Sequence, residues 1–190
     1  MTSKRLRILG IPGSLRRRSY NRGLLEAAAE LAPDGMEVEI TDLASIPLYN
    51  ADVEDEGVPP SVQTFRAQIA AADGLLLATP EYNHMLPGVL KNAIDWATGD
   101  GRGKNPLQGK PAAVMGASSG IVGTARAQLA LRQVLASTDC YVLLPNPQIL
   151  VGGAKDRFDP DGRLTDEPTR KRIRLLLKVF RAWIDRLRPR

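Results

Sequence analysis

Serine, arginine and asparagine gather in one short segment that follows the first apolar stretch of the 190-residue chain. The segment begins at Gly13 and reads Gly-Ser-Leu-Arg-Arg-Arg-Ser-Tyr-Asn. A helix is expected to start there, and its free N–H groups and dipole favour an anion. Ser14, Ser19 and Arg16 would add hydroxyl and guanidinium donors, with Asn21 as a further neutral donor. We interpret the segment as a phosphate-binding loop; a capped helix whose arginines face water is the alternative.

Two later loops carry polar groups that suit a flat heteroaromatic ring. The segment 80–83, Pro-Glu-Tyr-Asn, offers backbone amides, a side-chain amide and an aromatic edge. Ser118, Ser119 and Gly120 follow another apolar strand, and glycine there lets the backbone approach a ligand. N–H groups in that loop would stabilise negative charge on a reduced flavin. An inward-packed Tyr82 and a plain glycine-rich turn are the structural alternatives.

The chain lacks the usual motifs for larger nucleotides. From Gly10 it reads Gly-Ile-Pro-Gly, so the dinucleotide fingerprint G-x-G-x-x-G is absent. The Gly-Lys pairs at 103–104 and 109–110 are followed by asparagine and proline, so neither is a P-loop. A monophosphate cofactor such as FMN therefore suits the first loop better than ATP.

One segment imitates a hydrolase. Gly-Ala-Ser-Ser-Gly at 116–120 matches the nucleophile elbow G-x-S-x-G, which would make Ser118 the nucleophile. That fold needs a histidine after the serine, and the single histidine, His84, comes before it. A serine hydrolase is therefore the weaker enzyme hypothesis.

Strand and helix patterns alternate along the chain, as they do in a parallel sheet with helices on both faces. In such a sheet, ligands bind beyond the carboxyl ends of the strands, so the three loops should meet there. Residues 44–60 and 99–109 read as long loops; Ser61 is expected to cap one helix and Pro87 to open another. We expect strands at 6–11, 36–40, 74–79, 111–117 and 140–144, the last resuming at 148–151, and helices at 21–31, 61–72, 87–98, 122–136 and beyond the turn at 159–162.

The net charge of +5 raises the question of nucleic acid. Much of the excess lies in 170–190, where it flanks an apolar stripe at helical spacing. We interpret these charges as the outer face of a packed helix, because no DNA- or RNA-binding signature accompanies them. The stripe consists of Ile173, Leu176, Leu177, Phe180, Ile184 and Leu187.

Length and composition indicate one domain, residues 1–190. No stretch approaches the roughly 18 apolar residues of a membrane span, and the N-terminal apolar stretch is too short for a signal peptide. We therefore expect a cytoplasmic protein with no membrane partner. The single Cys140 excludes an internal disulfide, and its apolar neighbours favour an inert buried thiol. One cysteine and one histidine cannot form the usual soft-ligand metal site.

Three motifs in order resemble the NADPH-dependent FMN reductase family, which includes bacterial quinone, chromate and azo-dye reductases. They are Gly-Ser-Leu-Arg-x-x-Ser-x-Asn at 13–21, Pro-Glu-Tyr-Asn at 80–83, and Ser-x-Gly-x-x-Gly at 118–123 with a following Arg-Ala-Gln. The resemblance covers essentially the whole chain. It implies a flavodoxin-like three-layer sandwich with a five-stranded parallel sheet in the order 2-1-3-4-5. The third motif departs from many relatives, which carry more glycine there.

The resemblance also implies roles for individual residues and an assembly. Members of the family are usually homodimers or homotetramers with the flavin near the subunit interface. By this resemblance, Ser14, Arg16, Ser19, Tyr20 and Asn21 hold the FMN phosphate; Pro80, Glu81, Tyr82 and Asn83 line the isoalloxazine ring; and Ser118, Ser119 and Gly120 close its pyrimidine side.

We therefore expect an FMN-dependent oxidoreductase in which NADPH or NADH passes hydride to flavin N5 and a small acceptor is then reduced. Quinones, azo compounds, chromate and free flavin are the candidate acceptors. No catalytic side chain is needed, because the cofactor carries the chemistry. A non-catalytic FMN-binding electron carrier is the alternative. His84 is expected at a surface or interface, and Arg102 and Lys104 are considered for the 2′-phosphate of NADPH.

Overall fold

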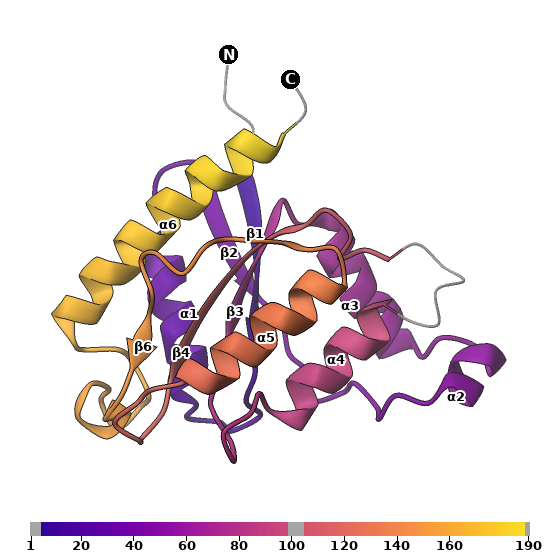
Figure 1. The fold of residues 1–190 in the computed structure, drawn as a ribbon, viewed down its shortest axis with the longest axis horizontal. Helices are drawn as coiled ribbons and strands as arrows, with labels where there is room; N and C mark the ends of the chain where they lie inside the picture. Colours follow the sequence, from indigo (N-terminus) through magenta and orange to yellow (C-terminus); the bar gives the residue numbers. More distant parts are fainter. Residues whose placement is uncertain (1–4, 99–104, 189–190) are drawn as a thin grey trace.

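The computed structural model describes residues 5–98 and 105–188. Its central parallel sheet has the strand order β2-β1-β3-β4-β5, and β6 also pairs with β4 (Figure 1). The predicted strand order is confirmed, and it places the carboxyl ends of β1, β3 and β4 at one edge of the sheet. The strands are β1 (Leu6–Pro12), β2 (Met36–Ile40), β3 (Gly74–Ala78), β4 (Pro111–Ala117), β5 (Tyr141–Val142) and β6 (Leu150–Val151).

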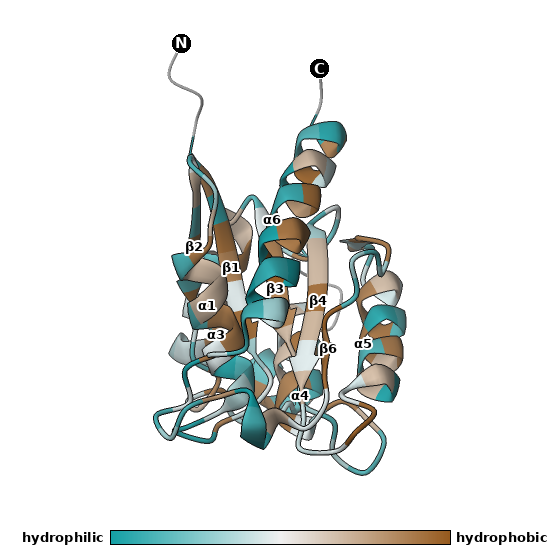
Figure 2. Cartoon of the chain, turned by 90° about the vertical axis from the view of Figure 1, so that its left-hand side faces the viewer, coloured by the Kyte–Doolittle hydropathy of each residue, from teal (hydrophilic) through white to brown (hydrophobic). Residues whose placement is uncertain are grey.

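Helices cover both faces of the sheet, α1 and α6 on one face and α3, α4 and α5 on the other. Successive strand residues point to opposite faces, so Ile8 packs with the first pair of helices and Leu9 with the other three. Figure 2 shows the consequence as apolar strands between helices with one hydrophilic side. The helices are α1 (Tyr20–Glu30), α2 (Ala51–Glu56), α3 (Pro60–Ala71), α4 (Gly88–Thr98), α5 (Ala125–Ser137) and α6 (Glu167–Leu187), with a short 3₁₀ turn at Ala154–Asp156.

The segment 44–60 is not a continuous loop, as the sequence analysis expected, because it contains α2. Asn50 caps this helix, since its side chain accepts a hydrogen bond from Asp52 N–H at 2.9 Å. Proline is absent between Asn50 and Glu56, so nothing interrupts the short helix. No residue of α2 is buried, and in Figure 1 it lies apart from the sheet and its covering helices.

Several helix starts differ from the predictions. Ser61 does not cap α3, because the helix already begins at Pro60, whose missing N–H costs nothing in a first turn. The helix expected from residue 122 begins only at Ala125. Gly123 has φ of +68°, a left-handed conformation that interrupts any helix before it. Pro87 lies just before α4 rather than inside it.

The predicted fifth strand is two short strands. β5 pairs with the beginning of β4, and β6 pairs with its end. Pro145 and Pro147 lie between them, and proline cannot donate a ladder hydrogen bond. The interruption leaves the carboxyl end of β4 paired with β6, which brings the segment after β6 beside the loop after β4.

The C-terminal helix α6 packs by the stripe that the sequence indicates, from Ile173 through Ile184. Several of its arginines pair with carboxylates: Arg170 lies 3.1 Å from Glu30, and Arg174 lies 2.8 Å from Glu167. These pairs agree with the interpretation of a packed helix with a charged outer face. Across the described residues, no helix is both long and apolar enough to cross a membrane.

Candidate functional site

The three polar loops meet at the carboxyl ends of β1, β3 and β4, around a cavity of about 160 Å³. The expectation that the parallel sheet brings them together is therefore correct. Of the residues proposed for the site, all but Asn83 and Gly120 line this cavity, and Ala117 joins them. The proposed residues that line it are Ser14, Arg16, Ser19, Tyr20, Asn21, Pro80, Glu81, Tyr82, Ser118 and Ser119.

The first loop carries its hydroxyl groups into the cavity from the end of β1. Gly13 N–H donates to the Ala78 carbonyl at 2.8 Å, which fastens the loop to β3. Ser14 and Ser19 are both buried. Ser19 caps α1, and its hydroxyl accepts from Arg22 N–H at 3.4 Å. The amino end of α1 is therefore aimed at the cavity, as an anion site requires.

Asn21 ties the first loop to the third. Its side-chain nitrogen donates to the Ala117 carbonyl at 2.9 Å, and its oxygen accepts from the Ala117 N–H at the same distance. Both ends of this buried amide are thus engaged by the end of β4. Asn21 lines the cavity, but its side chain acts on the protein backbone, so its contribution is to hold the two loops in register.

The second loop is a tight two-residue turn. Tyr82 and Met85 exchange backbone hydrogen bonds of 3.1 and 3.0 Å, and the residues between them, Asn83 and His84, both have positive φ. This geometry is that of a type I′ hairpin turn. Tyr82 does not pack into the core, since 48% of it is exposed, and its hydroxyl lies 3.4 Å from Ser14 Oγ. Asn83 lies at the turn tip, outside the cavity lining.

Glu81 joins the second loop to α5. Its carboxylate accepts from the N–H groups of Arg126 at 3.0 Å and Ala127 at 3.1 Å, and from the Arg126 guanidinium at 3.0 Å. Burial raises the pKa of Glu81, but the hydrogen bonds from Ala127 and Arg126 outweigh burial and hold that pKa below its ordinary value. The Arg-Ala-Gln motif belongs to the family resemblance, but the sequence alone does not indicate that Glu81 caps α5.

The third loop is held from several sides. Ser118 N–H donates to the Val151 carbonyl at 2.9 Å, and the Ser118 hydroxyl donates to the Gly123 carbonyl at 2.6 Å. This engagement weakens the hydrolase hypothesis, because the hydroxyl has a backbone acceptor instead of a base. His84, the one histidine of the chain, is exposed and lies 3.7 Å from Glu81.

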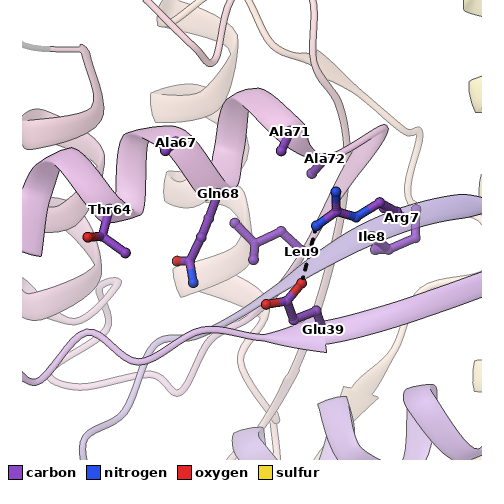
Figure 3. Close-up of a pocket in the computed structure, with 9 residues that line it drawn as sticks. All are labelled: Arg7, Ile8, Leu9, Glu39, Thr64, Ala67, Gln68, Ala71 and Ala72. Atoms are coloured by element: carbon purple, nitrogen blue, oxygen red, sulfur yellow. Dashed lines mark ion pairs between the residues drawn. The ribbon is translucent and has the colours of Figure 1, made fainter.

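A second cavity, of about 250 Å³, lies between β1, β2 and α3 (Figure 3). Arg7, near the start of β1, points toward Glu39 and pairs with it at 3.6 Å. Gln68 accepts from the Thr41 hydroxyl at 2.7 Å. Arg7 and Glu39 pair with each other, and the cavity is lined by the first half of β1, away from the carboxyl ends of β1, β3 and β4. We therefore assign no ligand to it.

Comparisons with known proteins identify the family to which this site belongs. A model of the NADPH-dependent FMN reductases matches residues 6–156. The chain belongs to the NADPH-dependent FMN reductase family. The matched residues include all three loops of the site.

Relatives of this FMN reductase family member align over nearly their whole length. It is 50% identical to an NAD(P)H-dependent FMN reductase of Pseudomonas aeruginosa over 183 residues, covering 96% of this chain and 97% of that protein. A quinone reductase of Escherichia coli is 38% identical over 189 residues, covering 98% and 99%. The solved structure of FerB, an NAD(P)H:(acceptor) oxidoreductase of Paracoccus denitrificans, superposes with a TM-score of 0.85 at 35% identity, covering 95% and 98%.

The comparisons confirm the family, the flavodoxin-like fold, and an oxidoreductase that depends on FMN and NAD(P)H. They leave the roles of individual residues as predictions. Arg102 and Lys104, which were considered for the 2′-phosphate of NADPH, lie outside the described residues. No group of side chains suited to a metal ion occurs within 5–98 and 105–188.

Proposed function

We propose that this FMN reductase family member binds FMN in the cavity at the ends of β1, β3 and β4 and reduces quinones with electrons from NAD(P)H. One observation carries the proposal. Buried Ser14 and Ser19, the guanidinium of Arg16 and the start of α1 converge on the cavity, and the exposed Tyr82 lines it beside Ser14.

The residues present fit a phosphate at the first loop. Serine hydroxyls donate to phosphate oxygens, an arginine adds charge and a forked donor, and a helix start adds backbone N–H groups. In the described chain, Arg16 forms no ion pair, so its charge is available to an anion. The carboxylate that lines the cavity, that of Glu81, is engaged by the Arg126 guanidinium and by the first N–H groups of α5.

When bound, FMN supplies the chemistry of hydride acceptance from the nicotinamide and electron transfer to the acceptor. The chain positions that cofactor. Asn21 fixes the spacing of the first and third loops, and Glu81 fixes the second loop against α5. Tyr82 and Ser119 are exposed at the rim, so a flat acceptor reaches the site without a protein group having to move.

Quinones are the acceptors we favour. The names of the relatives support them, since one of the proteins compared above is a quinone reductase. The site offers no acid or base that would be dedicated to another chemistry, because the Glu81 carboxylate is engaged by α5 and the Ser118 hydroxyl by a backbone carbonyl. Dependence on NAD(P)H also fits the cytoplasmic location that the sequence analysis expects.

A homodimer or homotetramer is the assembly we favour. Apolar side chains are exposed around the second and third loops, including Met85 at 53% and Ile121 at 95%, with Leu129 exposed on α5. A second copy of the chain would cover such a surface. Light scattering on the purified protein measures the mass of the assembly directly, and a monomer at micromolar concentration would contradict it.

Steady-state oxidation of NADPH and NADH with and without a benzoquinone tests the function. We expect rapid quinone-dependent oxidation by the FMN-loaded protein and slow oxidation without quinone. A protein that holds FMN but oxidises neither nicotinamide would instead be the electron carrier considered above. Oxidation of NADPH or NADH that requires free FMN and is not stimulated by quinone would identify free flavin, not quinone, as the acceptor.

A further inference from the structure

Another cavity, which we call the hollow, adjoins the proposed FMN cavity at the ends of β1, β3 and β4 and shares Arg16 and Tyr20 with it. Its volume is about 290 Å³. One wall comes from the first loop, with Arg18, and the other comes from the segment after β6, with Lys155 and Phe158. Because Arg16 and Tyr20 line both spaces, the hollow lies at the side of the first loop, where we place the phosphate end of FMN.

The hollow has an aromatic wall. The rings of Tyr20 and Phe158 are 4.9 Å apart between centroids and inclined by 39°, and the Arg16 guanidinium lies 5.9 Å from the centre of the Tyr20 ring. Phe158 is buried, whereas Tyr20 is only half-buried and offers surface to the hollow. A flat base could pack on such a wall, as bases do on aromatic side chains.

The wall is rigid. The segment after β6 packs so closely on α1 that a Cβ atom on Gly23 would lie 2.1 Å from the Gly162 carbonyl oxygen. Arg157 braces the same segment, because its guanidinium donates to the Gly152 carbonyl at 3.1 Å and to Asp166 at 2.7 Å. Close packing of the segment after β6 on α1, together with the hydrogen bonds of Arg157, therefore sets the shape of the hollow.

The hollow is positively charged. Arg16, Arg18 and Lys155 are exposed, and none of the three forms an ion pair within 5–98 and 105–188. One carboxylate, Asp159, also lines the hollow, and its Oδ1 accepts from the N–H groups of its own turn, including Arg163 at 2.8 Å. Because Arg16 is assigned to the FMN phosphate, Arg18 and Lys155 against one engaged carboxylate supply the attraction for a second anion.

We propose that this hollow binds the adenosine 2′-phosphate end of NADPH, an inference that rests on the proposed function. Arg18 and Lys155 would bind the phosphate, and the Tyr20 and Phe158 wall would contact the adenine. The FMN phosphate does not need these two cations, because they do not line the cofactor cavity, which has its own hydroxyl, guanidinium and helix-start donors. NADH lacks the 2′-phosphate, so the hollow makes the protein prefer NADPH.

Calorimetric titration of the FMN-loaded protein with 2′,5′-ADP tests the site without any turnover. Charge-assisted hydrogen bonds contribute about 1.5–3 kcal/mol each, so Arg18→Gln and Lys155→Gln should each weaken binding about tenfold or more. The same variants should raise KM for NADPH by a similar factor and leave KM for NADH unchanged. Arg163→Gln is the matched control, because it removes a cation from the same segment but outside the hollow, and it should change neither.

The absorbance of bound FMN, recorded on every sample, separates this proposal from the proposed function. A chain that binds no FMN contradicts the proposed function and, with it, this inference. If the protein binds FMN but binds 2′,5′-ADP equally well with and without Arg18 and Lys155, the assignment of the hollow is wrong and the proposed function stands. The same conclusion follows from a chain that binds inorganic phosphate or 5′-AMP as tightly as 2′,5′-ADP, or one whose Arg18→Gln variant loses FMN and not NADPH affinity.

Discussion

The carboxylate of Glu81 holds Arg126 twice, by its backbone N–H and by its guanidinium, each at 3.0 Å. The two residues are far apart in the chain, and the contact makes Glu81 the cap of α5. Thr124, the residue at the position where a capping side chain would be expected, makes no such hydrogen bond. Glu81 therefore links the turn at Tyr82 directly to the first turn of α5.

Glu81→Gln should lower the free energy of unfolding by about 1 kcal/mol, because a neutral amide caps a helix less well than a carboxylate. FMN affinity should fall as well, since the ring loop loses its anchor. Urea unfolding followed by circular dichroism measures the first effect. Glu26→Gln removes a carboxylate from an exposed pair on α1 and should stay within about 0.5 kcal/mol of the wild type.

The contribution of Glu81 should depend on pH in one direction. Its folded-state pKa is lowered by the hydrogen bonds from Ala127 and Arg126, which outweigh the opposing effect of burial. The stabilisation is therefore present above the unfolded-state pKa and is lost as pH falls through the lower folded-state pKa. The stability difference between wild type and Glu81→Gln should be full at neutral pH and shrink in acid. A difference that grows in acid would show that the carboxylate is not the cap.

Asn21→Ala should destabilise the protein by about 2–4 kcal/mol, because it leaves the buried N–H and carbonyl of Ala117 without partners. Asn21→Asp keeps the acceptor for Ala117 N–H, loses the donor to the Ala117 carbonyl and adds a negative charge. Because that charge lies beside the proposed phosphate, FMN affinity should fall further in Asn21→Asp than in Asn21→Ala. Equal FMN affinity in Asn21→Asp and the wild type would show that the phosphate does not bind at this loop.

Two glycines should respond in opposite ways to alanine. A Cβ atom on Gly116 would lie 2.1 Å from Thr124 Oγ1 and 2.3 Å from the Thr79 carbonyl oxygen, so Gly116→Ala should cost about 3 kcal/mol or more. A Cβ atom on Gly88 would meet nothing within 4 Å, and Gly88→Ala should leave stability unchanged or raise it by up to about 1 kcal/mol. Thermal unfolding of both variants checks the pair, and similar losses would mean that the third loop packs less closely than the contacts imply.

Ser118→Ala should loosen the third loop. We expect no hydrolytic activity in either the wild type or this variant. The Ser118 hydroxyl donates to the Gly123 carbonyl, and losing a neutral hydrogen bond costs about 1 kcal/mol. Quinone reduction should persist at a reduced rate. Hydrolysis of an activated ester by the wild type that disappears in Ser118→Ala would restore the serine hydrolase that the sequence pattern suggested.

The alternation of strand and helix patterns was sufficient to predict a parallel sheet and the meeting of the loops, whereas the strand order was predicted from the family resemblance. A fully apolar strand such as Gly74–Ala78 and the β-α alternation leave few topologies, and each topology sends the loops to one edge. The short helix α2 was missed because its signal is a single cap, Asn50, in a segment dominated by prolines and acids.

The details of the site depend on contacts between residues distant in the chain, which no local pattern shows. Asn21 was expected at the phosphate, yet its amide bonds the backbone of Ala117, 96 residues away. Glu81 was expected beside the ring, yet its carboxylate is used on α5. Polar residue types predicted the place, whereas only the fold decides whether a polar group is free for a ligand or engaged by the protein.

Titration of the FMN-free protein with FMN, followed by quenching of flavin fluorescence, tests whether the first loop holds the FMN phosphate. We expect saturation at equimolar FMN and an affinity that falls at least tenfold in Arg16→Ala, since a charge-assisted contact is lost. Arg17→Ala, which removes the neighbouring charge outside the cavity lining, should titrate like the wild type. Failure of the wild-type chain to bind FMN, or an Arg16→Ala curve that coincides with the wild-type curve, would show that the first loop is not the phosphate site.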